Sequence, residues 1–152
     1  MADFEFYDSA VEAELKKNGI YASVTKGVSM QPLFRTNRDM IILKTPDAPP
    51  KRFDVVLYKS RSGKYVLHRI IRVRKDEYVI RGDNTYSLEY VPKDGILAVL
   101  TEFNRKGKRR SASSKGYRLY ARFWNFIYPL RHLYVKSRSL ASKVYRAILK
   151  KK

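Results

Sequence analysis

Short, mostly apolar runs that alternate with turn segments fill residues 20–103 and constrain the fold more than any other feature. Runs of this length, bounded by Gly, Pro, Asp and Ser, are typical of short β-strands joined by tight connections. The predicted strands are residues 20–25, 40–43, 54–58, 65–73, 78–80 and 96–103.

A single helix is expected before the first strand. Ser9 and Glu12 have the spacing of a capping box, in which each residue satisfies a backbone N–H at the helix start. Gly19 is suited to end the helix in the left-handed conformation. Residues 1–104 are therefore predicted to form a mainly β domain of the α+β class with an N-terminal helix.

The positive charge of the chain is concentrated after this domain. Residues 105–152 hold 16 of the 33 Lys and Arg residues and none of the 14 acidic residues. Residues 105–116 are basic, contain Ser and Gly and lack a hydrophobic period, which predicts a linker. Residues 117–152 predict a basic, aromatic, amphipathic helical tail, and Pro129 should divide it into two helices.

The tail is expected to bind an anionic partner. Leu119, Phe123, Phe126 and Leu130 follow one helical stripe among basic residues, a pattern that suits the headgroup layer of a membrane. The same stripe could instead pack on the domain or on another copy of it. Single-stranded nucleic acid fits less well, because the apolar spacing is helical rather than that of a stacking platform.

The sequence predicts a cytoplasmic protein that is peripheral to the membrane. No run approaches the roughly 18 apolar residues of a membrane-spanning helix, and the acidic N-terminus lacks the basic region of a signal peptide. The absence of cysteine excludes disulfides and cysteine-based metal sites. Two histidines argue against a histidine-rich metal site, and we expect no cofactor.

Ser29 and His68 are the first candidate pair of catalytic residues, as nucleophile and general base. Residues 27–32 read GVSMQP, which places Ser29 between a flexible glycine and a rigid proline. A serine hydroxyl needs a positioned base to become a nucleophile. His68 lies between Val66 and Ile70 on an apolar face, where burial would keep the imidazole neutral, as a general base requires. A turn serine and a core histidine with ordinary hydrogen bonds would give the same pattern.

Several ordered segments resemble the signal peptidase/LexA-type serine protease superfamily. GVSMQP at 27–32 matches the nucleophile segment, DMII at 39–42 and DVV at 54–56 match the two segments that follow, and GDN at 82–84 matches a later one. VLHRI at 66–70 matches the segment that carries the base. This position holds histidine, as in the archaeal and endoplasmic-reticulum type of signal peptidase.

The resemblance implies a β fold of that superfamily and a Ser/His peptidase mechanism. Ser29 would attack a peptide carbonyl while His68 takes its proton, and the Ser29 N–H would supply part of the oxyanion hole. Asp83 matches the acidic residue of GDN, and Glu89 lies where a second, orienting aspartate usually follows. Either carboxylate could orient His68.

The resemblance also implies that Met30 and Pro32, which flank the nucleophile, contact the substrate. The chain departs from the family at Arg38 and Phe53, which replace the glycines that usually precede the two aspartates at 39 and 54. The sequence therefore does not determine the backbone conformation of these two turns.

Two further departures concern function. From the sequence we expect neither the N-terminal membrane anchor of signal peptidases nor the DNA-binding domain of LexA-like repressors. The expected function is therefore a serine endopeptidase with a specialised processing role, which cuts a leader or trims a partner at the cytoplasmic membrane face. Its substrates would be peptides or proteins with a small residue before the cut. The alternative is a catalytically silent peptide-binding domain whose tail binds membrane or nucleic acid.

Overall fold

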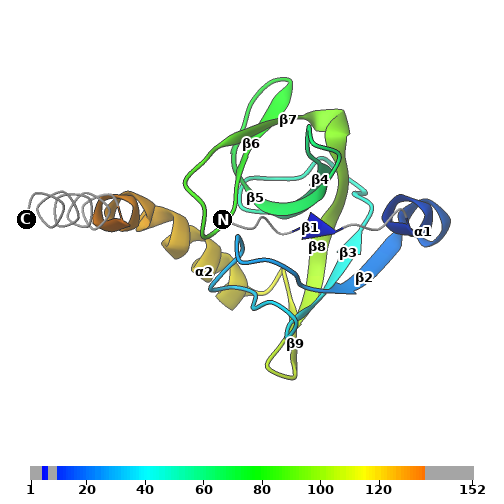
Figure 1. The fold of residues 1–152 in the computed structure, drawn as a ribbon, viewed down its shortest axis with the longest axis horizontal. Coiled ribbons are helices and arrows are strands. Elements are labelled where there is room, and N and C mark those ends of the chain that lie inside the picture. Colours follow the sequence, from blue (N-terminus) through cyan, green and yellow to red (C-terminus); the bar gives the residue numbers. More distant parts are fainter. Residues whose placement is uncertain (1–4, 7–9, 136–152) are drawn as a thin grey trace, which may run out of the picture.

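A computed structural model of the chain describes residues 5–6 and 10–135, and this part is mainly β with α-helices at its two ends (Figure 1). The elements are β1 (Glu5–Phe6), α1 (Ala10–Asn18), β2 (Ile20–Val24), β3 (Met40–Lys44), β4 (Val55–Lys59), β5 (Tyr65–Val73), β6 (Glu77–Arg81), β7 (Glu89–Pro92), the 3-10 turn η1 (Lys93–Gly95), β8 (Ile96–Arg105), β9 (Lys108–Ser111) and α2 (Lys115–Phe126). The α+β class predicted from the sequence is confirmed.

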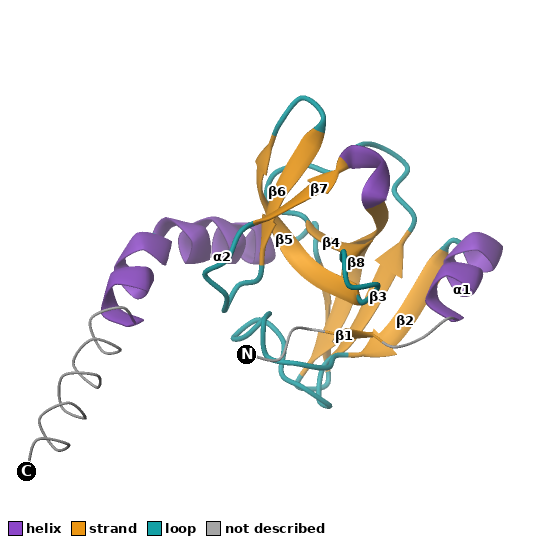
Figure 2. Ribbon diagram, turned by 45° about the horizontal axis from the view of Figure 1, so that its top comes forward, coloured by secondary structure: helices purple, strands orange, loops and turns teal. Residues whose placement is uncertain are grey.

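The nine strands of the described residues form one antiparallel sheet. Its order is β2-β3-β8-β4-β5-β6-β7, with β1 paired to β5 and β9 paired to β8. The sheet curls strongly, as Figure 2 shows. The six predicted strands correspond to β2, β3, β4, β5, β6 and β8, whereas β1, β7 and β9 were not predicted.

Strand β9 corrects the prediction of a linker at residues 105–116. Lys106 and Gly107 have φ values of 53° and 76°, which is the requirement for both central residues of a tight type I′ hairpin turn. The turn joins Arg105 to its cross-strand partner Lys108. Residues 108–111 therefore belong to the sheet. Their side chains are all polar, so no apolar alternation in the sequence indicated a strand.

Helix α1 ends as the sequence predicts. Gly19 has a φ of 69°, and its N–H donates to the carbonyl of Leu15 at 2.8 Å, so the glycine caps the last turn. Val11 and Leu15 are buried against the sheet. Ser9, the predicted N-cap, lies outside the described residues.

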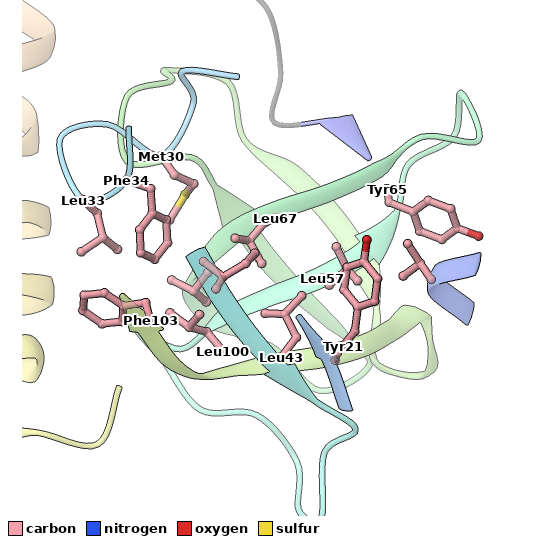
Figure 3. Close-up of a cluster of buried hydrophobic side chains, with 14 of the residues drawn as sticks. Tyr21, Met30, Leu33, Phe34, Leu43, Leu57, Tyr65, Leu67, Leu100 and Phe103 are labelled. Atoms are coloured by element: carbon pink, nitrogen blue, oxygen red, sulfur yellow. The ribbon is translucent and has the colours of Figure 1, made fainter. Parts of the chain in front are cut away.

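Strand β5 separates two apolar clusters, because the curled sheet encloses side chains on both of its faces. Leu67 belongs to the larger cluster, part of which Figure 3 shows, and Val66 and Ile70 belong to the smaller one. The prediction that both faces of residues 65–73 are largely apolar is confirmed for residues 65–70. Two adjacent polar residues of β5, His68 and Arg69, thus point into opposite buried regions.

The first part of the predicted tail packs on the domain. Ser114 caps helix α2 by accepting a hydrogen bond from the N–H of Tyr117, and Tyr117 and Ala121 are buried. Residues 128–135 are helical again after a break at Ile127, which confirms a division close to Pro129. Over the residues that the structure describes, no helix is long and apolar enough to cross a bilayer.

Candidate active site

His68 is buried at the centre of the sheet, opposite Val56 of β4. Its side chain is almost inaccessible, and Nδ1 lies 2.9 Å from Glu89 Oε1. The hydroxyl of Tyr58 lies 3.3 Å from the same nitrogen. The imidazole is therefore held from one side by a carboxylate and a phenol.

Glu89 reaches His68 because β7 pairs with β6 and β6 with β5. Burial raises the pKa of Glu89, but hydrogen bonds from His68 and Tyr58 outweigh it, so that the pKa lies below its ordinary value. An ionised carboxylate can only accept a hydrogen bond. His68 must then donate from Nδ1, which in the neutral ring leaves a lone pair on Nε2.

His68 Nε2 is buried and has no hydrogen-bond partner among the described residues. Most buried polar atoms are paired, and an exception often marks a catalytic or ligand-binding role. The nitrogen faces Gly82, where a Cβ atom would lie only 3.0 Å away. The unpartnered nitrogen thus lies next to the turn that follows β6.

This turn, residues 82–84, also holds the backbone of Ser29. The N–H of Asn84 donates to the carbonyl of Ser29 at 2.7 Å, and Asn84 Nδ2 donates to the carbonyl of Val28 at 3.3 Å. A Cβ at Gly82 would lie 2.7 Å from the Ser29 carbonyl oxygen and 3.0 Å from His68 Nε2. The structure therefore brings the segment of the predicted nucleophile next to the predicted base, and Gly82 makes the close approach possible.

Asp83 contacts Arg69 and not His68. Arg69 Nε donates to Oδ1 and Nη2 donates to Oδ2, each at 2.7 Å. Of the two carboxylates that the sequence offered as partners of the base, Glu89 is the one in contact with it. Asp83 belongs to a separate, buried ion pair.

The ion pair is completed by groups around the guanidinium. Arg69 Nη1 donates to the carbonyl of Phe53 at 2.9 Å and to the Tyr117 hydroxyl at 3.2 Å. Burial opposes the charge of Arg69, but the attraction of Asp83 outweighs it and raises the pKa of the arginine. A bidentate guanidinium–carboxylate pair that is almost completely buried fixes the position of Asp83.

The helical segment after β9 is attached to the same turn. Trp124 Nε1 donates to the carbonyl of Asp83 at 2.9 Å, and both terminal nitrogens of Arg131 donate to that oxygen at 3.1 and 3.2 Å. The Tyr120 hydroxyl donates to Asp83 Oδ2 at 3.4 Å. Residues 117–131 therefore hold the turn next to His68 and Ser29 in place. This part of the chain is attached to the domain and is not a separate tail.

Met30 and Pro32, the residues predicted to contact substrate, have different environments. Met30 has no exposed surface and packs with Leu33 and Phe34 in the larger apolar cluster (Figure 3). Pro32 is exposed, and its carbonyl accepts a hydrogen bond from Arg105. Met30 is a core residue in this structure, so its side chain could contact a substrate only if the site opened.

Phe53 and Arg38, which stand where the family usually has glycine, differ in backbone conformation. Phe53 has a φ of 78°, the left-handed conformation that glycine adopts readily and other residues adopt at a cost of about 1–2 kcal/mol. Its N–H donates to the carbonyl of Ile70 at 2.8 Å, which helps to hold this conformation. At the other turn Asn37, not Arg38, has a positive φ, of 57°.

Three residues of this region were missed as site residues in the sequence, namely Tyr58, Arg69 and Gly82. A signal existed for Arg69, since an arginine inside an apolar strand needs a buried partner. Gly82 is the first residue of the GDN motif, but its close approach to Ser29 and His68 depends on which strands pair, and so does the role of Tyr58. Within the described ranges, no group of three or more His, Asp or Glu side chains is arranged to hold a metal ion.

No protein-family model matches the chain, and no curated protein matches its sequence. The likeness to the signal peptidase/LexA superfamily therefore depends on the ordered motifs alone.

Proposed function

We propose that this protein is a serine endopeptidase of the signal-peptidase type, built on a signal peptidase/LexA-like β fold. Ser29 is the nucleophile, His68 the general base and Glu89 the residue that orients the base. One observation carries the proposal: His68 is hydrogen-bonded to Glu89 through Nδ1, while its unpartnered Nε2 faces the turn that binds the carbonyl of Ser29.

The reaction follows the general logic of acyl transfer. Ser29 Oγ attacks the scissile carbonyl carbon as His68 Nε2 takes the hydroxyl proton. The tetrahedral intermediate collapses, the C–N bond breaks, and His68 returns the proton to the departing amine. A water molecule then gives a proton to His68 and hydrolyses the acyl-enzyme, which restores the Ser29 hydroxyl. Glu89 stabilises the imidazolium that forms in each half-reaction.

Asp83 has a positioning role in this proposal. Its ion pair with Arg69 and its contacts with the helical segment set the path of residues 82–84. Those residues in turn fix the distance between the Ser29 segment and the imidazole. Asp83 thus acts on the reaction through the backbone of the turn.

The second candidate function is a catalytically silent domain that binds peptides. It is favoured by the burial of both reactive residues, since Ser29 is 2% and His68 1% exposed. A peptidase with this site has to open when the substrate binds, whereas a silent binding domain does not. Apo active sites commonly tighten or rearrange in the substrate complex, so burial does not exclude the peptidase, and the silent domain ranks second.

The distinguishing experiment is a cleavage assay with a mixture of peptides that vary at the residue before the scissile bond. We expect cleavage after small residues, a preference that the family resemblance implies. Ser29→Ala should abolish cleavage and keep the thermal stability of the wild type. Ser62→Ala, at an exposed hairpin serine, is the matched control and should cleave normally. Cleavage that survives in Ser29→Ala would remove the assignment.

A further inference from the structure

Seven large apolar side chains of the C-terminal helical segment are exposed, Tyr134 and Val135 among them, and the other five recur every three or four residues. These five are Leu119, Phe123, Phe126, Leu130 and Leu133, with exposed fractions of 70, 57, 81, 69 and 67%. Their spacing of four, three, four and three residues is that of one helical stripe, which continues across the break at Ile127. We call these five residues the outer stripe.

The opposite side of the same segment is attached to the domain. Tyr117 and Ala121 are buried, Trp124 and Arg131 donate to the carbonyl of Asp83, and the Tyr128 hydroxyl donates to the carbonyl of Tyr86 at 3.4 Å. These positions lie about half a turn from the outer stripe at 3.6 residues per turn. The stripe therefore points away from the body of the protein, and Figure 1 shows the segment projecting from one side of the sheet.

The charge around the outer stripe has one sign. Arg118 and Arg122 are exposed beside it on α2. No acidic residue follows Glu102 in the sequence, and residues 136–152 add seven Lys and Arg. An apolar stripe whose charged neighbours on the helical segment are all basic is complementary to a surface that offers both hydrocarbon and negative charge.

Two other partners for the outer stripe, a second copy of the chain and single-stranded nucleic acid, fit it less well. A second copy of the chain would bring an equally basic segment against this one, and like charges at close range repel. Single-stranded nucleic acid binds through aromatic stacking platforms, but three of the five side chains of the stripe are leucines, which cannot stack on bases. An anionic lipid bilayer fits the apolar and the basic components together.

We propose that the outer stripe is a docking surface for anionic membranes, and that the helical segment lies in the headgroup layer while its inner side stays attached to the domain. This inference does not depend on the proposed peptidase activity. It places the turn at residues 82–84 on the membrane-proximal side of the protein, because Asp83 is held by the inner side of the same segment. The protein would then work on substrates presented at a membrane surface.

The test is co-sedimentation of the full chain with vesicles of phosphatidylcholine alone and with vesicles that also contain phosphatidylserine. The stripe variant carries Phe126→Ser and Leu130→Ser. The control variant carries Ile20→Ser and Tyr90→Ser, two apolar residues that are 46 and 48% exposed elsewhere on the protein. We expect the wild type and the control to bind the anionic vesicles, and the stripe variant to bind at least about tenfold more weakly.

A second variant tests the contribution of the basic residues beside the outer stripe. Arg118→Gln with Arg122→Gln should weaken binding by about fivefold per charge, and this loss should shrink at high salt. The loss in the stripe variant should persist at high salt, because it reflects apolar contact.

Four outcomes would overturn the proposal. These are no vesicle binding by the wild type, equal binding by the stripe variant, a dimer in light scattering that the stripe mutations dissociate, and oligonucleotide binding that they abolish. Cleavage of a free peptide in solution should be the same for the stripe variant and the wild type. A failure of the membrane proposal therefore stays distinguishable from a failure of the peptidase proposal.

Discussion

Glu89 Oε1 lies 2.9 Å from Nδ1 of His68, although the two residues are 21 positions apart in the sequence. Two successive hairpin pairings, β5 with β6 and β6 with β7, carry the carboxylate to the imidazole. The contact leaves Nε2 as the basic nitrogen and directs it at Gly82. In the proposed peptidase, this relationship decides which atom of His68 can take the Ser29 proton.

Replacing Glu89 by Gln should lower kcat while KM changes little. The amide keeps the size of the side chain but can donate to Nδ1, which stabilises the tautomer whose Nε2 already carries a proton. We expect a loss on the order of 10⁴-fold in kcat, the effect found when the orienting carboxylate of a serine protease triad is neutralised. Steady-state kinetics of the purified variants measure this, with Glu89→Asp as a shorter carboxylate that should retain part of the activity. An unchanged kcat in Glu89→Gln would exclude the orienting role.

The stability of the protein should depend on pH through Glu89. Its folded-state pKa lies below the ordinary value of 4.5, since hydrogen bonds from His68 and Tyr58 outweigh the effect of burial. The ionised form therefore stabilises the fold above the unfolded-state pKa, and this stabilisation disappears as the pH falls through the folded-state pKa. Denaturant unfolding of wild type and Glu89→Gln should show a difference that is largest near neutral pH and shrinks in acid. A difference that grows on acidification would contradict the direction of the shift.

Gly82→Ala should damage both stability and activity. The added Cβ would lie 2.7 Å from the Ser29 carbonyl oxygen and 3.0 Å from His68 Nε2, so the turn or the imidazole must move. Overpacking of this kind costs about 1–3 kcal/mol. Gly116→Ala is the matched control, because its Cβ would meet nothing within 4 Å and alanine favours the helix by at most about 1 kcal/mol. Thermal unfolding compares the two, and equal stability of the Gly82 variant and the wild type would refute the close approach.

Arg69→Met should be strongly destabilising, because it leaves the Asp83 carboxylate buried without its partner. Breaking a buried ion pair from one side costs about 3–5 kcal/mol, whereas replacing both partners often costs much less. The double variant Arg69→Met/Asp83→Asn should therefore recover part of the loss. Urea denaturation of the two single variants and the double variant measures the coupling. Additive losses would show that the pair is not an energetic unit.

Much of the sheet could be predicted from the sequence, because six of its strands are apolar runs with clear turns between them. Strand β5 was predicted with its bounds, since Tyr65–Val73 alternates between two apolar faces. Strands β7 and β9 could not be predicted in the same way. Glu89–Pro92 is short and contains proline, and Lys108–Ser111 has no apolar period. Both strands exist because a neighbouring strand offers unpaired hydrogen-bonding groups.

The candidate site was predictable in its residue types but not in its contacts. The motifs supplied a serine, a histidine and two carboxylates, but nothing in the sequence told which carboxylate reaches the imidazole. Asp83 is nearer to His68 in sequence, yet its side chain belongs to Arg69 on the other face of β5. Partner choice depends on strand register and on which face each side chain occupies, and these follow from the pairing of the whole sheet.

The most direct test of the central claim is covalent labelling of Ser29 with a fluorophosphonate, which phosphonylates serine only when a neighbouring base activates it. Tryptic digestion releases Ser29 in the peptide of residues 27–35, where it is the only serine, so mass spectrometry can assign the adduct without ambiguity. The proposed mechanism predicts an adduct on this peptide in the wild type and none in His68→Ala. An unlabelled wild-type peptide, or labelling that persists without the imidazole, would contradict it.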